Sequence, residues 1–172
     1  LINRKLHGYN HQNTAFAYKE LAKAFEAQGD YEKAIGSLKN STNITATLKR
    51  DGEESILADT YMLIAQLSEK LENYEESLKY LNMTVPILVK LFGKDNEYLY
   101  PIYEMMANCY ARTDRLKQAV ILGQKVVDYY TNKLGSESSE VAKALNQLGT
   151  YYRDQGETSK AIEAFEKSVR IY

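Results

Sequence analysis

The sequence predicts an all-α fold, a right-handed α-solenoid built from four antiparallel helix-turn-helix repeats. Three observations predict it: a small residue recurs every 42 or 43 residues, a second small residue follows at a constant offset, and turn residues separate the two. A period of this length is typical of solenoids, in which each helical unit buries its apolar face against its neighbours.

The first small residue lies in the middle of each predicted first helix, at Ala22, Ala65, Ala107 and Gly149. An apolar residue precedes each of these positions, and a tyrosine or leucine three places earlier shares the same helical face. The periodicity therefore predicts first helices near residues 13 to 28, 55 to 71, 98 to 112 and 139 to 155.

The second small residue marks the second helix of each repeat, at Ala34, Ser77, Ala119 and Ala161. These helices are expected near residues 31 to 49, 74 to 91, 116 to 133 and 158 to 172. Short side chains at both positions let the paired helices approach closely. Replacing Ala107 or Ala161 by leucine is therefore expected to destabilise the fold by about 1 to 3 kcal/mol.

Residues typical of turns separate the two helices and follow the second one. The turns between paired helices begin at Gly29, Glu72, Asp114 and Gly156. A further glycine follows each second helix, at Gly8, Gly52, Gly93 and Gly135, where a left-handed helix end is expected. The repeats then span about 13–51, 55–92, 97–134 and 139–172 of a single array over residues 1–172. Since no polar capping helix is recognisable, we expect this array to be a fragment of a longer one.

The repeats carry a recognisable order of side chains. The third contains Tyr103, Met106, Ala107, Tyr110 and Ala119, and the fourth contains Leu145, Leu148, Gly149, Tyr152, Ala161 and Phe165. This order resembles the tetratricopeptide repeat family. The period of about 42 residues and the segment 134–142 are similar to the long repeats of kinesin light chains. Ser68 and Gly123 depart from the pattern, because large side chains are expected there.

The resemblance implies a binding surface on the inner face of the superhelix. In this family the surface carries first-helix residues three before, one after and four after the small position. The corresponding candidates are Lys19, Lys23, Glu26, Met62, Gln66, Glu69, Glu104, Asn108, Asn146, Thr150 and Arg153. Polar side chains of these types can hold an extended peptide by hydrogen bonds to its backbone.

The expected function is a scaffold for a protein or peptide partner, similar to the cargo adaptors of kinesin light chains or to cytoskeletal and ciliary scaffolds. A peptide-sensing regulatory domain that controls an effector domain outside this segment is the alternative. A third class is a binding region attached to a catalytic domain elsewhere. In each case further repeats or domains of the same protein are expected as partners.

Composition disfavours nucleic acid and membranes as partners. The formal charge is -1, from 22 basic and 23 acidic residues, so no positive field draws in polyanions. No apolar run reaches the length of about 20 residues that a membrane-spanning helix needs. The single cysteine forms no internal disulfide, which fits a reducing compartment, so a cytoplasmic location is expected.

The sequence shows no arrangement typical of catalysis, and neither a cofactor nor a metal is expected. His7 and His11 flank Gly8 without a third ligand nearby in sequence. Cys109 has no histidine within its own repeat and is interpreted as a buried packing residue. The glycines are scattered singly instead of forming a phosphate-binding loop.

Overall fold

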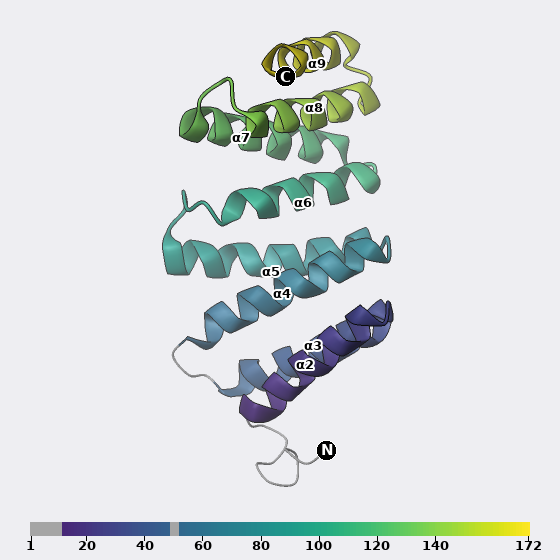
Figure 1. The fold of residues 1–172 in the computed structure, drawn as a ribbon, viewed down its shortest axis with the longest axis vertical. Helices are drawn as coiled ribbons and strands as arrows, with labels where there is room; N and C mark the ends of the chain where they lie inside the picture. Colours follow the sequence, from purple (N-terminus) through teal and green to yellow (C-terminus); the bar gives the residue numbers. More distant parts are fainter. Residues whose placement is uncertain (1–11, 49–51) are drawn as a thin grey trace. The chain divides into compact units, whose positions relative to one another are not determined.

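The computed structural model describes residues 12–48 and 52–172, and within these ranges the chain is helical without any strand. Eight α-helices follow one another in antiparallel pairs, as Figure 1 shows for the part of the chain that the model describes. The predicted all-α repeat fold is confirmed.

The helix bounds agree with the periodicity to within about two residues. The first helices are α2 (Gln12–Ala27), α4 (Glu53–Lys70), α6 (Leu99–Arg112) and α8 (Ser139–Asp154). The second helices are α3 (Tyr31–Leu48), α5 (Tyr74–Phe92), α7 (Leu116–Leu134) and α9 (Thr158–Ile171). Leu99 begins α6, so Pro101 falls in its first turn, where a missing N–H costs no hydrogen bond.

The helices form two compact units, which we call the N-terminal unit (described residues up to Asn96) and the C-terminal unit (Glu97–Tyr172). In the N-terminal unit α2 packs on α3, α3 on α4 and α4 on α5. In the C-terminal unit the same order holds for α6, α7, α8 and α9. Each second helix that has a following repeat in its unit therefore contacts two first helices.

The small residues lie where the helices approach most closely. Ala22, Ala65 and Ala107 are at most 3% exposed. A Cβ atom added at Gly149 would lie 2.7 Å from the Phe165 ring of α9, which is closer than carbon atoms pack. The expected close contact between paired helices is confirmed at these positions.

The turn between paired helices has one conformation in all four repeats. Its first residue has a positive φ, of 78° at Gly29, 56° at Glu72, 59° at Asp114 and 85° at Gly156. The amide of the next residue donates back to a carbonyl in the last turn of the first helix, as from Asn73 to Ser68 at 2.8 Å. This bond pattern closes the carbonyl end of a helix and needs a left-handed residue. Glu72 and Asp114 adopt that conformation despite their Cβ atoms.

The glycines that follow the second helices in the described ranges also have positive φ, but the expected left-handed conformation is wrong for Gly93 and Gly135. Gly93 and Gly135 combine φ near 90° with ψ of 170° and 158°, an extended conformation open mainly to glycine. Gly52 is left-handed and directly precedes α4. At these sites the chain must reverse direction toward the next helix instead of only ending the last one. Gly8, His7 and His11 lie outside the described residues.

Cys109 is fully buried on α6, as the packing interpretation predicted. Within residues 12–48 and 52–172, no three histidine, cysteine, aspartate or glutamate side chains gather closely enough to hold a metal ion. Among the same residues, no helix is both long and apolar enough to cross a membrane.

Candidate partner-binding site

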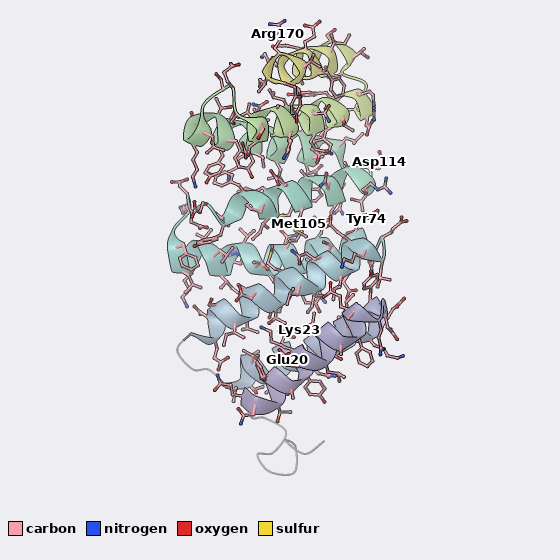
Figure 2. The ribbon with its side chains drawn as sticks, viewed as in Figure 1. Glu20, Lys23, Tyr74, Met105, Asp114 and Arg170 are labelled. Atoms are coloured by element: carbon pink, nitrogen blue, oxygen red, sulfur yellow. The ribbon has the colours of Figure 1, made fainter. Side chains whose placement is uncertain are left out.

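In the N-terminal unit, the predicted site residues lie on α2 and α4, and Lys23 and Glu26 each form an ion pair within the protein. The Lys23 ammonium is 2.7 Å from the Glu20 carboxylate on the same helix, and Figure 2 labels both residues on α2. The Lys70 ammonium of α4 is 2.9 Å from the Glu26 carboxylate of α2. Exposed ion pairs of this kind contribute little to stability, so a charged group of a ligand can take the place of one partner. The remaining candidates here are Lys19, Met62, Gln66 and Glu69.

In the C-terminal unit, the predicted residues are Glu104 and Asn108 on α6 and Asn146, Thr150 and Arg153 on α8. Asn146 and Arg153 are exposed. The Thr150 hydroxyl donates to the Asn146 carbonyl of its own helix at 3.2 Å, and the Arg153 guanidinium lies 2.9 Å from the Asp154 carboxylate.

Asn108 connects the two first helices of this unit. Its side-chain oxygen accepts a hydrogen bond from the Tyr151 hydroxyl at 2.5 Å and another from the Gln147 amide at 3.1 Å. Both donors belong to α8. Because both bonds end on the oxygen, the NH₂ group of Asn108 is the part that can donate to a ligand carbonyl.

A cavity of about 230 Å³ lies beside Asn108 between α6 and α8. Its apolar lining consists of Ala107, Gly123, Val126, Ala144 and the Tyr151 ring, and its polar lining consists of Glu104, Asn108, Lys143 and Gln147. Three lining side chains have one carbon or none, so the packed helices leave space.

Gly123 explains why this space exists. The repeat alignment places it at the positions of Leu38, Leu81 and Phe165, and the two leucines are almost completely buried. A Cβ atom at Gly123 would lie 3.1 Å from the Tyr151 ring and 3.3 Å from Leu148, so α8 has settled against the glycine. Gly123 and the Tyr151 ring that approaches it both line the cavity.

Glu104 gives the rim of the cavity a partly desolvated carboxylate. Burial raises the pKa of Glu104, and a hydrogen bond with Tyr130 of α7 opposes that rise in pKa. Burial and the nearby Glu104 raise the pKa of the Tyr130 phenol to about 12. At neutral pH the phenol thus keeps its proton and can donate to Glu104.

The structure brings two of the five predicted residues of this unit, Glu104 and Asn108, into the cavity lining. Asn146, Thr150 and Arg153 are not part of that lining. Sequence reasoning missed Gln147 and Tyr151, whose role depends on their bonds to Asn108. The glycine at position 123 was visible as a departure from the repeat and is the signal that could have located the cavity.

Family models described as tetratricopeptide repeat match residues 56–132 and 98–172, and a further model with this description matches residues 17–51. Together they account for most of the chain.

Among curated proteins, the chain is 21% identical over 147 residues to Protein KINESIN LIGHT CHAIN-RELATED 1 of Arabidopsis thaliana, covering 85% of this chain and 24% of that protein. It is 27% identical over 111 residues to Response regulator aspartate phosphatase E of Bacillus subtilis, covering 64% of this chain and 28% of that protein. The chain therefore spans about a quarter of the length of these relatives.

Among solved structures, the fold is similar to a putative kinesin light chain from Podosopora anserina with nearly identical TPR-like repeats. The TM-score is 0.81 at 24% sequence identity, covering 99% of this chain and 80% of that one. The repeat order, the helix pairs and these matches lead to one conclusion. The chain belongs to the tetratricopeptide repeat family and has repeats like those of kinesin light chains.

Proposed function

We propose that this chain is a non-enzymatic scaffold that binds a protein or peptide partner along its first helices, with α6 and α8 providing a central contact. Repeats of this family are typical of protein–protein interaction, and the cavity beside Asn108 is the observation that supports the choice of these helices.

The shape of the cavity favours a peptide over a small molecule. Pockets that enclose small ligands have volumes of roughly 300 to 1,000 Å³. The cavity between α6 and α8 is smaller, at about 230 Å³. Such a space suits one side chain of a longer ligand, while the polar residues around it bind the ligand backbone.

The polar lining indicates how the peptide is held. The Asn108 NH₂ group can donate to a peptide carbonyl, and the Gln147 side-chain oxygen can accept from a peptide N–H, which matches an extended peptide backbone. Asn146 is exposed on α8 and can add a further amide contact. The Glu104 carboxylate, already raised in pKa by burial, gains most from a ligand group that donates a hydrogen bond or carries positive charge.

The test begins with a pulldown that uses the chain as bait and identifies the bound proteins. The double variant Asn108→Ala and Asn146→Ala is then expected to weaken the strongest partner by more than about tenfold, or about 1.4 kcal/mol. Titration calorimetry measures the loss, and circular dichroism checks that the helices remain.

A matched control removes the same groups elsewhere. Asn40 and Asn43 are exposed on the second helix α3, so Asn40→Ala with Asn43→Ala is expected to leave the affinity unchanged. If the α6 and α8 double variant binds as well as the parent, the partner contacts another surface and the proposal is wrong.

Two biological settings fit such a scaffold. The similarity to Protein KINESIN LIGHT CHAIN-RELATED 1 supports a cargo adaptor or a cytoskeletal or ciliary scaffold. The alternative is a peptide-sensing domain that controls an effector, and the similarity to Response regulator aspartate phosphatase E supports its regulatory part. The sequence that flanks the repeats in the whole protein distinguishes them, because heptad repeats upstream favour the adaptor and an effector domain favours the sensor.

A further inference from the structure

A second and larger cavity lies in the C-terminal unit, between the second helices α7 and α9. Its volume is about 550 Å³, and α8 lies beneath it. The aliphatic part of its lining consists of Val127, Val141, Leu145, Leu148, Ala164 and Ile171. These residues do not line the cavity between α6 and α8, so the two spaces are separate.

The N-terminal unit shows what fills the equivalent space between α3 and α5. By the repeat alignment, Leu145 corresponds to Tyr61 and Ala164 to Tyr80. The Tyr61 and Tyr80 rings are both buried, and their centroids lie 5.6 Å apart. The N-terminal unit thus holds a pair of rings where the C-terminal unit has a leucine and an alanine. Leu145 and Ala164 leave unfilled the volume that two rings occupy in the N-terminal unit, whereas Tyr152 lines the cavity at the position of Ser68.

An ion pair across the N-terminal space also lacks a counterpart. The Lys39 ammonium of α3 lies 2.5 Å from the Glu76 carboxylate of α5. The alignment places Gln124 and Lys160 at these positions, and an amide and an ammonium cannot form an ion pair. The Lys160 ammonium instead lies 3.4 Å from the carboxylate of Glu157, the residue directly before α9. Gln124 and Lys160 therefore cannot form between α7 and α9 the ion pair that Lys39 and Glu76 form between α3 and α5.

Basic side chains predominate around the opening. Lys160, Lys167 and Arg170 belong to the lining, against the two carboxylates of Glu137 and Glu163. Figure 2 labels Arg170 on α9. The basic residues are more than half exposed, and their ion pairs are with carboxylates three or four residues away in the sequence. The Lys160 ammonium also lies 5.7 Å from the centroid of the Tyr152 ring. Ion pairs this exposed contribute little to stability, so a ligand carboxylate can replace their glutamate partners at a small cost in free energy.

We propose that the cavity between α7 and α9 is a second docking site, which takes a protein segment that inserts a tyrosine-sized ring beside Leu145 and Ala164 and places a carboxylate near Lys160. The ring is inferred from Tyr80, which occupies the equivalent space in the same chain. The carboxylate is inferred from the charge at position 160, where a lysine replaces the Glu76 that pairs with Lys39. This site does not depend on the proposed contact at Asn108.

The probes for the test are 4-hydroxyphenylacetate, which carries both a phenol ring and a carboxylate, and p-cresol, which carries only the ring. Each is titrated into the ¹⁵N-labelled chain and followed by amide chemical shifts. We expect saturable shifts around Leu145, Lys160 and Ala164 with both probes, and tighter binding of the acid. Shifts confined to the α6 and α8 cavity, or none at all, would overturn the proposal.

Ala164→Tyr supplies the ring that Tyr80 supplies in the N-terminal unit and is expected to abolish the shifts with both probes. Because this variant enlarges a buried residue, Lys160→Glu provides an independent test on an exposed side chain. Lys160→Glu is expected to weaken the binding of 4-hydroxyphenylacetate at least about threefold at low salt and to leave the binding of p-cresol unchanged. Equal weakening of both probes would contradict the role of Lys160.

Matched controls separate this site from the first one. Lys143→Glu makes the same charge change at the rim of the α6 and α8 cavity and is expected to leave both titrations unaltered. The Asn108→Ala and Asn146→Ala variant is expected to bind both probes like the parent. Loss of probe binding in that variant would assign the probes to the α6 and α8 cavity and refute a separate site.

Discussion

The Ser168 hydroxyl on α9 donates a hydrogen bond to the backbone carbonyl of Ala142 on α8, over 2.8 Å. Ser41 on α3 makes the corresponding bond to the carbonyl of Ala15 on α2, over 2.9 Å. Both serines are almost fully buried. In the second repeat Thr84 bonds to Tyr80 of its own helix instead. A direct polar bond between paired helices is thus a feature of the first and fourth repeats.

Ser168→Ala is expected to lower the free energy of unfolding by about 0.5 to 1.5 kcal/mol, the usual net value of one buried hydrogen bond. Urea unfolding measures this change. Ser136→Ala removes an exposed hydroxyl that contacts only its neighbour Glu137 and is expected to have no effect. Equal urea midpoints for the two variants would show that the bond to Ala142 adds no stability.

Replacement by alanine is expected to change protein stability in opposite directions at two helical glycines, Gly149 and Gly36. At Gly149 the new Cβ would lie 2.7 to 3.0 Å from three atoms of the Phe165 ring, so either that ring or the helix that carries it must shift. Gly149→Ala should therefore destabilise the protein by about 1 to 3 kcal/mol. At Gly36 the Cβ meets nothing within 4 Å, so Gly36→Ala should stabilise α3 by about 0.5 to 1 kcal/mol. Thermal unfolding distinguishes the two, and a stabilising Gly149→Ala would contradict the close contact.

Glu72→Gly is expected to stabilise the turn between α4 and α5. Glu72 has a φ of 56°, in the left-handed region where a Cβ atom costs about 1 to 2 kcal/mol. Glycine removes that cost but loses more entropy on folding, so a net gain of about 0.5 kcal/mol is expected. The control Glu32→Gly lies in the first turn of α3 and should destabilise. Thermal unfolding of both variants checks the opposite signs.

The sequence predicted the helices, their bounds and the close-contact positions because the repeat offers four observations of each position. Ala107 and Ala161 stand out by recurrence alone. The sequence did not reveal the two cavities, because a cavity depends on the combined sizes and the packing of several side chains from different helices. Gly123 was recognisable as an exception, but Ala164 was not, since alanine is unremarkable without the Tyr80 ring of the N-terminal unit beside it. The Ser168 bond was also missed, because only two of the four repeats make it.

Glu104 is expected to make stability depend on pH in a direction opposite to that of most carboxylates. Burial raises the pKa of Glu104 above its ordinary value of 4.5. The folded protein therefore binds a proton at Glu104 more readily than the unfolded chain does. The contribution of this group to the free energy of unfolding must then increase as pH falls from neutral toward 4.5.

Glu104→Gln isolates this contribution, because glutamine keeps the shape and an oxygen that accepts from Tyr130 but carries no charge. At neutral pH the variant is expected to be more stable than the parent, since it buries no carboxylate. The difference should shrink as pH falls toward 4.5, because the folded parent then carries a proton on Glu104 more often. Glu163, whose pKa is lowered in the folded state, contributes equally to the stability of both proteins, so its effect cancels in the difference.

Urea unfolding of the two proteins at several pH values between 7 and 4.5 measures this stability difference. A stability difference independent of pH would mean that the Glu104 pKa is the same in the folded and unfolded states, so its desolvation at the cavity rim would be ruled out.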